Sequence, residues 1–307
     1  MMISASLVKE LRERSGAGMM DCKKALTETN GDLEAAIDWL RKKGLSAAAK
    51  KSGRTAAEGL VGVYAQGVHG AICEVNAETD FVARNDAFKQ YVRNVAQLAL
   101  AAGDDLAKLK TLNYPGSNHT VEDELTTLIA TIGENMTLRR AQSLTVPSGL
   151  VTSYIHNKVD EGLGRIGVLV ALESSASPDH LESLGRQLAM HIAATAPQAL
   201  TVEKLDPQLV EKERCVVKEQ ALTSGKPANV VDQMVEGRMK KFYKEVVLSE
   251  QAFVMDPDRS ISQLIEDTGK SLGTDIKLKD FVRFSLGEGI EKKDEDFASE
   301  VAAQLNK

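Results

Sequence analysis

The spacing of apolar residues changes along the chain and divides it into helical and sheet-forming stretches. Over residues 1–54 apolar side chains recur three or four positions apart, beginning with Leu7, Val8 and Leu11, which predicts amphipathic helices. Glycines interrupt the pattern twice, and Asp32 suits the N-cap of a third helix. The sequence therefore predicts a compact unit of three short helices.

After this unit the alternation of apolar and polar positions becomes that of strands. Residues 60–65 and 71–77 alternate in this way and are joined near Gly67 and Gly70, which predicts a β-hairpin. From about Asp86 to Ala102 the period returns to that of a helix with one apolar face. A hairpin followed by a helix is expected here.

The same order of elements is repeated later in the chain. Gly59-Leu60-Val61-x-x-Tyr64 is matched by Gly149-Leu150-Val151-x-x-Tyr154, and the strand expected to end at Glu78 is matched by one ending at Glu173. These matches predict two related α+β subdomains, each a β-hairpin packed under a helix, with a shared core.

Two strongly charged helical runs, 206–224 and 227–244, follow the second repeat and are separated by Gly225-Lys226. Glycine ends helices and proline begins them, so Pro227 at the start of the second run supports an antiparallel helical hairpin. Its apolar residues are too sparse for a core element, which predicts that it projects. Two roles stay open for it, contact with a partner and self-association through Val216, Val230 and Met234.

The last residues combine a strand pattern at 281–286 with an acidic amphipathic helix over 288–307 that carries Phe297. The predicted fold class is therefore α+β, with antiparallel strands, a helical hairpin and a C-terminal helix. The expected domains are a three-helix domain over 1–54, a core N-subdomain over 55–148, a core C-subdomain over 149–285 with the hairpin at about 206–245, and a C-terminal module over 286–307.

Composition narrows the function classes. The 307 residues are 43% hydrophobic and 27% charged, which is typical of a globular protein. A net charge of −6 argues against general nucleic-acid binding. The first residues form no signal peptide and no apolar run is long enough to span a membrane. Three scattered cysteines fit reduced thiols, so we expect a cytoplasmic protein.

Several motifs resemble catalytic or nucleotide-binding signatures but occur in the wrong context. Residues 162–167 match GxGxxG, yet they precede a strand instead of joining a strand to a helix. Residues 268–271, Thr-Gly-Lys-Ser, resemble the end of a phosphate loop, but Leu264 occupies the place of its first glycine; a turn after a short helix is expected instead. The five histidines have no zinc spacing, and His191 is expected to be a hydrogen-bonded core residue. The sequence predicts no catalytic residue, metal site or cofactor.

The connection between the second strand and the following helix contains an unusual segment, Thr79-Asp80-Phe81-Val82. In one interpretation Asp80 caps a short turn while Phe81 and Val82 cover the core. In the other, Phe81 is exposed and anchors a partner, since binding residues concentrate in connections and aromatic residues dominate binding energy.

Residues 79–85 resemble the signature of the elongation factor Ts family, and residues 14–26, including Met19 and Met20, resemble its N-terminal signature. Segments 224–227, 234–242, 282–284 and 287–291 are also similar, so the resemblance covers nearly the whole chain in the family's order.

The resemblance implies a ubiquitin-associated-like N-terminal domain and an exchange factor that releases GDP from elongation factor Tu. It implies that Asp80 and Phe81 enter the partner's GTPase domain and disturb its Mg²⁺ and phosphate sites, with Met19, Met20 and Phe297 contacting the same domain. His156 is implied to contact another domain of the partner. Contacts beyond it do not transfer, because residues 157–164 form a longer turn than the family's.

This interpretation predicts no direct binding of nucleotide, nucleic acid or membrane, and a 2:2 assembly with the partner is one of its alternatives. A different class of protein also fits the sequence: a scaffold whose N-terminal domain and helical hairpin bind proteins without any exchange activity. An enzyme that uses nucleotides through residues 162–167 is the third interpretation.

Overall fold

The computed structural model describes residues 3–223 and 227–291. Its N-terminal part confirms the three expected helices, which are α1 (Ala5–Ser15), α2 (Met19–Glu28) and α3 (Leu33–Lys51). The carboxylate of Asp32 accepts a hydrogen bond from the Ala35 amide at 3.0 Å, as expected of an N-cap. Leu11, Cys22 and Leu26 are fully buried among these helices, which therefore have a small core of their own.

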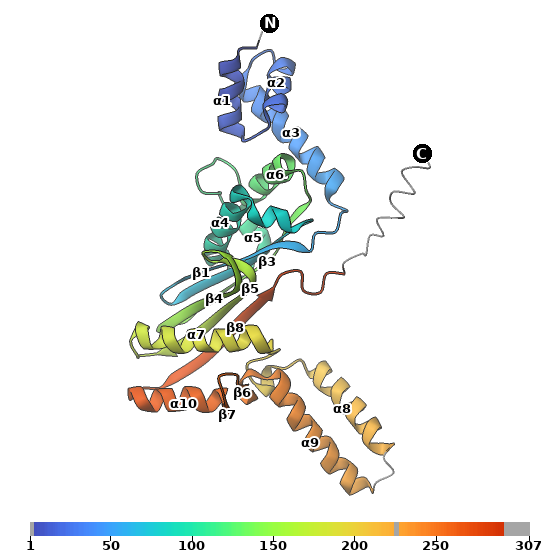
Figure 1. Cartoon of the computed structure of the whole chain (residues 1–307), viewed down its shortest axis with the longest axis vertical. Helices are drawn as coiled ribbons and strands as arrows, with labels where there is room; N and C mark the ends of the chain where they lie inside the picture. Colours follow the sequence, from blue (N-terminus) through green and yellow to red (C-terminus); the bar gives the residue numbers. More distant parts are fainter. Residues whose placement is uncertain (1–2, 224–226, 292–307) are drawn as a thin grey trace.

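Helix α3 joins the N-terminal helices to the rest of the molecule (Figure 1). Its Gly44 lies against Ala130 of helix α6 (Val121–Ile132), where an added Cβ would be 3.5 Å from the Ala130 Cβ. Arg41 donates to the Asp123 carboxylate at 2.7 Å. Burial alone would raise the pKa of Asp123, but hydrogen bonds from Thr120 and Arg41 outweigh it and hold the pKa below its usual value.

A six-stranded antiparallel sheet forms the centre of the molecule, in the order β3-β2-β1-β5-β4, and β8 also pairs with β5. Its strands are β1 (Glu58–Gln66), β2 (His69–Ala77), β3 (Met136–Thr145), β4 (Gly149–Asp160), β5 (Leu163–Ser174) and β8 (Ile276–Ser285). The β1–β2 pair is the hairpin predicted from the alternating pattern. Two ladder pairs between β1 and β5, Val61 with Gly164 and Gly62 with Leu163, join the two hairpins. Backbone hydrogen bonds from the Val63 amide to Gly162 and from the Val151 amide to Gly67 add to them.

Helices cover the sheet in two groups, one for each repeat (Figure 1). Helix α4 (Asp86–Ala102) packs on β1 and β2 with α5 (Leu106–Thr111) and α6 nearby, while α7 (Pro178–Thr195) packs on β4 and β5. The strand faces turned away from these helices pack together. That third cluster contains Val61, Ile72, Val151, Leu169 and Val282, and because strands of both repeats contribute to it, the expected shared core is confirmed.

Two glycines show how closely the repeats correspond. Gly59 and Gly149 have φ angles of +119° and +116° and stand opposite Asn76 and Glu173 in their hairpins. A Cβ on Gly59 would lie 2.2 Å from the Val75 carbonyl oxygen, and a Cβ on Gly149 would lie 2.1 Å from that of Leu172. The motif that repeats in the sequence therefore marks the same backbone geometry twice.

The charged runs form the predicted helical hairpin, α8 (Pro207–Leu222) and α9 (Ala228–Val246), which projects from the body (Figure 1). It has its own small cluster, in which Val217 and Met239 are buried and Met234 is half-buried, while Val216 is exposed.

Beyond the hairpin lie β6 (Ala252–Phe253), β7 (Asp256–Ser260) and α10 (Ile261–Leu272). The expected C-terminal helix does not begin at residue 288, because residues 288–291 are turn and irregular structure. The rest of that prediction, with Phe297, lies outside the described residues. The proposed domain boundaries stay predictions.

Two further sequence-based expectations are wrong. Residues 157–164 do not form a long turn, because β4 continues to Asp160 and β5 begins at Leu163, with a bulge between Lys158 and Asp160. Thr268 to Ser271 do not follow a helix but lie in the last turns of α10. A helix C-terminus repels anions, so this position also argues against a phosphate site.

Candidate protein-contact site

The Asp80-Phe81 segment forms a single 3-10 helix, Asp80–Arg84, between β2 and α4. Its length is limited by the residue on each side. Thr79 is in an extended conformation before it, and the carboxamide of Asn85 accepts from the Phe88 amide at 3.1 Å to begin α4. The connection from β2 to α4 is therefore one short 3-10 helix, and its first residues, Asp80 and Phe81, lie at the surface.

Two neighbouring apolar residues of this turn differ sharply in exposure. The side chain of Val82 is only 3% exposed and packs in the core beneath α4, whereas Phe81 is 71% exposed. Asp80 is exposed as well. The interpretation in which Phe81 covers the core is therefore wrong, and Val82 anchors the turn without offering surface to a partner.

A carboxylate from another element holds the start of the turn. Glu134, in the short connection between α6 and β3, accepts from the Thr79 hydroxyl at 2.6 Å and from the Thr79 amide at 2.9 Å. The neighbouring Glu78 accepts from the Asn135 amide and forms an ion pair with Arg54. The residues that lead into the Phe81 turn are thus tied to the body at two neighbouring positions, so the exposed ring follows a fixed base.

Sequence reasoning missed Glu134 for a physical reason. It lies 55 residues from Thr79, and no local pattern distinguishes it from any other surface glutamate. The proximity arises only when β3 pairs with β2 and brings the end of α6 to the end of β2.

The other predicted contact residues are distributed over the molecule. Met19 and Met20, at the start of α2, are 59% and 75% exposed. His156 is exposed on β4, with its Nδ1 at 3.3 Å from the Tyr154 hydroxyl. Exposed large apolar side chains on rigid elements are suited to contact a partner.

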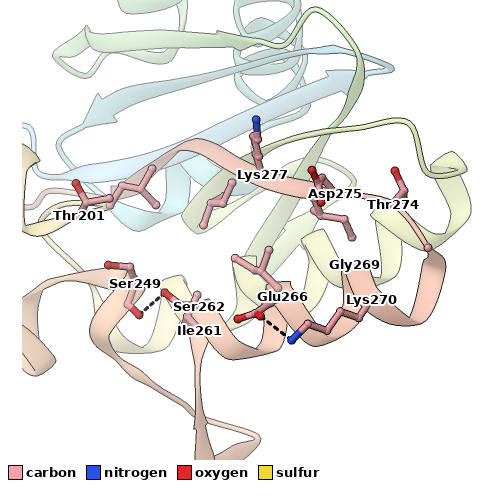
Figure 2. A pocket seen from close by; sticks show the side chains of 15 residues that line it. Thr201, Ser249, Ile261, Ser262, Glu266, Gly269, Lys270, Thr274, Asp275 and Lys277 are labelled. Carbon is pink, nitrogen blue, oxygen red and sulfur yellow. Dashed lines mark hydrogen bonds and ion pairs between the residues drawn. The ribbon is translucent and has the colours of Figure 1, made fainter.

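A groove with a volume of about 860 Å³ lies elsewhere, between α10 and β8 (Figure 2). Ile261, Ile265 and Leu278 line it, and Lys270 at its rim is paired with Glu266 at 2.6 Å. No nucleophile with an adjacent base appears among its lining residues.

Titratable groups elsewhere have structural roles. His191 is fully buried, and its Nε2 lies 2.9 Å from the Gln251 side-chain oxygen, which confirms the expected core histidine; burial lowers its pKa. All three cysteines are free, and burial raises the pKa of Cys73 to about 12.

Within residues 3–223 and 227–291, no cluster of three or more metal-ligating side chains occurs. Over the same ranges, no helix is both long and apolar enough to cross a membrane.

These features define an α+β protein in which two copies of a hairpin-and-helix unit share one sheet and carry a projecting helical hairpin. The family model described as "Elongation factor TS" matches residues 78–288. The chain is 61% identical over 306 residues to elongation factor Ts of Rhodospirillum rubrum, covering 99% of each chain. It is 60% identical over 301 residues to that of Rhodospirillum centenum, covering 98% of each. The chain belongs to the elongation factor Ts family, whose members are translation elongation factors.

Proposed function

We propose that the chain is a guanine-nucleotide exchange factor for elongation factor Tu that accelerates the release of GDP and involves no bond-making step of its own. The observation that carries this proposal is the exposed Phe81 beside Asp80 on a turn fixed by Glu134. An aromatic residue presented on a rigid base loses little conformational freedom on binding, so more of its contact energy remains available. A translational GTPase as partner places the chain in the cytoplasm.

The proposed mechanism is thermodynamic coupling between two ligands of the same GTPase. A nucleotide held through its phosphates and Mg²⁺ depends on close placement of oxygen ligands around a small cation. If Asp80 and Phe81 displace those ligands, the exchange factor binds the nucleotide-free partner more tightly than the GDP form. By linkage, it then weakens GDP binding by the same factor.

The size of the effect requires more than one contact. A thousandfold weakening of GDP corresponds to about 4 kcal/mol, whereas one aromatic hot spot supplies about 2 kcal/mol. We therefore assign additional contacts to Met19 and Met20, to His156, and to the C-terminal segment with Phe297.

The deciding experiment follows release of a fluorescent GDP from purified elongation factor Tu, with excess unlabelled nucleotide and a catalytic amount of this chain. The expected result is acceleration with many turnovers per molecule. Binding without acceleration would instead support a scaffold protein. Titration of the chain alone with GDP is expected to show no binding, because Gly162 lies in the β4–β5 turn and not before a helix.

Glu134 provides a test of how the turn is held. Replacing it with alanine removes both acceptors of Thr79, and hydrogen bonds to a charged group contribute about 1.5–3 kcal/mol each at most. We expect the concentration of this chain that gives half-maximal GDP release to rise roughly fivefold to tenfold, with the fold retained. Glu122→Ala, which removes an exposed pair between α6 and Lys110 of α5, serves as the control. Equal behaviour of the two variants would refute the positioning role of Glu134.

A further inference from the structure

Two chain segments that enter and leave the sheet touch at one point. Gly287, just after β8, has a φ of +71°, and a Cβ there would lie 2.4 Å from the carbonyl oxygen of Ala57. Ala57 precedes β1 and ends the connection from α3. The chain therefore leaves the sheet towards its C-terminus beside the place where the N-terminal helices join it.

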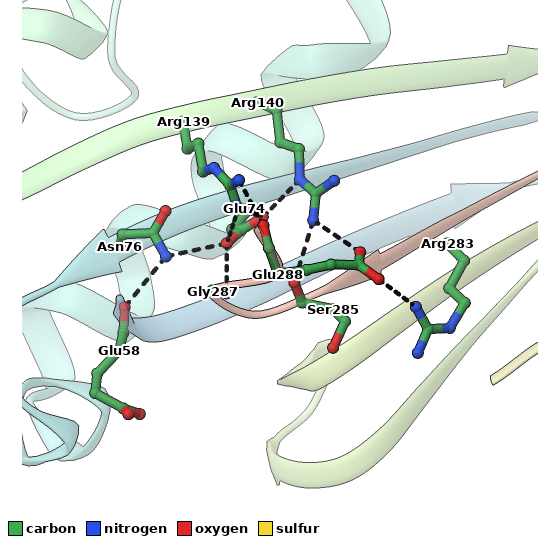
Figure 3. Close-up of polar contacts among 9 residues, drawn as sticks. All are labelled: Glu58, Glu74, Asn76, Arg139, Arg140, Arg283, Ser285, Gly287 and Glu288. Carbon is green, nitrogen blue, oxygen red and sulfur yellow. Dashed lines mark hydrogen bonds and ion pairs between the residues drawn. The ribbon is translucent and has the colours of Figure 1, made fainter. Parts of the chain in front are cut away.

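A buried carboxylate lies at this junction (Figure 3). The Glu74 side chain, on β2, is 0% exposed, and it accepts from the Gly287 amide at 2.8 Å and from the Asn76 side chain at 3.0 Å. Arg139 donates to it at 3.1 Å and Arg140 at 2.6 Å, both from β3. Every neighbour that Glu74 contacts in this way is a donor.

The two arginines also bind the outgoing chain directly. Arg139 donates to the backbone oxygen of Glu288 at 2.6 Å, and Arg140 donates to that of Ser285 at 3.1 Å. The Glu288 carboxylate lies 3.6 Å from Arg140 and 3.2 Å from Arg283. Backbone and side chain of the exit turn are thus held from several directions, as Figure 3 shows.

The charge of Glu74 is stable at neutral pH. Burial by itself would raise its pKa, but the Gly287 amide, Asn76 and Arg140 outweigh burial and hold the pKa below its ordinary value of 4.5. A carboxylate with a lowered pKa stabilises the folded state above its unfolded pKa, and this contribution is lost as the pH falls through the folded value. The contacts to the exit turn are therefore complete under physiological conditions.

We propose that Glu74 is a positioning residue that fixes, over residues 285–288, the direction in which the chain leaves β8 before any partner binds. For its effect on exchange this inference rests on the function proposed above. A segment whose starting direction is already fixed loses less conformational entropy on binding than a segment that leaves the sheet in many directions. The expected contribution is about tenfold in affinity, or about 1.4 kcal/mol.

The geometry can be tested without any partner. Spin labels at Gln66, on the far end of β1, and at Glu291 report the direction of the exit, in a Cys215→Ser background because Cys215 is the exposed cysteine. We expect a narrow distance distribution that broadens in Glu74→Gln, because the amide NH₂ would face other donors. Glu173→Gln, which affects a pair with Lys279 within the sheet, is the matched control and should leave it narrow.

A measurement on the unchanged protein covers the case in which Glu74→Gln fails to fold. The Gly287 amide is expected to exchange with solvent deuterium as slowly as the ladder amides of β8. Rapid exchange of this amide, or an unchanged narrow distribution in folded Glu74→Gln, would overturn the inference.

The consequence for exchange is tested by a double-mutant cycle in the full chain with Glu74→Gln and Phe297→Ala. Glu74→Gln is expected to raise the concentration of this chain that gives half-maximal GDP release about tenfold in the otherwise natural chain. When Phe297→Ala is also present, the rise is expected to be less than threefold. Additive effects would reject the link to the C-terminal segment. No acceleration by the unchanged chain would reject the proposed function instead, and the label distances would then decide the inference alone.

Discussion

Replacing Phe81 with alanine is expected to slow the catalysed release of GDP from elongation factor Tu by about 30-fold at a fixed low concentration of the exchange factor. The factor corresponds to the roughly 2 kcal/mol that an exposed aromatic anchor contributes when it becomes buried in a partner. Stability should hardly change, because the ring is 71% exposed and the neighbouring Val82 supplies the packing beneath the turn. Stopped-flow release of fluorescent GDP measures the rate, and thermal unfolding measures the stability.

Met255→Ala is the matched control for this experiment. Met255 is 48% exposed in the turn between β6 and β7, outside the predicted contact residues, so its loss should leave the release rate within about twofold of the unchanged chain. A folded Phe81→Ala protein that still accelerates GDP release at the original rate would show that Phe81 does not displace the ligands of the nucleotide in the partner.

The largest loss of stability is expected from Gly59→Ala, at about 3–5 kcal/mol. Alanine disfavours a φ of +119°, and its Cβ would lie 2.2 Å from the carbonyl oxygen of Val75 in the paired strand. Because the obstacle is backbone, only a shift of β1 against β2 could relieve it. Urea unfolding followed through the amide signals of these two strands would show the change.

Alanine substitutions at other glycines separate two costs: the contact of the added Cβ with a carbonyl oxygen, and the positive φ itself. Gly149→Ala should cost about as much as Gly59→Ala, since it meets the Leu172 carbonyl at 2.1 Å with nearly the same φ. Gly67→Ala has a positive φ but no atom within 4 Å of the added Cβ, so only the conformational cost of about 1–2 kcal/mol remains. A Gly59→Ala variant as stable as Gly67→Ala would contradict the close-approach explanation.

Local signals predicted the elements well where caps and period agreed. The helix expected over Asp86 to Ala102 has those bounds in the structure because Asn85 caps its start and Gly103 follows its end. The repeated Gly-Leu-Val motif identified the duplication because both copies need the same positive φ at glycine. Such features depend on a few neighbouring residues, and these are visible in a sequence.

Features that depend on distant pairing were not predicted. The alternating pattern of residues 71–77 predicted a strand, but both faces of β2 are covered, and nearly the whole strand, Glu74 included, is buried. The groups that make burial of Glu74 tolerable are 65 residues away at Arg139 and 213 residues away at Gly287. No window of sequence contains the carboxylate together with these partners.

In the candidate site, too, local features were predicted from the sequence, while features that depend on distant contacts were not. The segment around Phe81 was found from its composition and its place in a connection, but whether Phe81 covers the core or is exposed was undecided. A 3-10 turn of five residues is too short for its periodicity to be informative. Its orientation is set by Thr79 bound to Glu134, a contact that exists only after β3 has paired with β2.

The helical hairpin has a further consequence for how the chain can be altered. Its two ends return to the body side by side: the Leu248 amide donates to the Ala199 carbonyl at 2.9 Å and the Gln198 amide donates to Val246 at 2.8 Å. Its buried cluster is separate from that of the sheet. Segments that leave and re-enter a domain at neighbouring points tolerate replacement by foreign modules. The base of α8 and α9 is thus the natural insertion point for a fluorescent reporter, which would leave the sheet, the Phe81 turn and the Glu74 cluster with their own sequence.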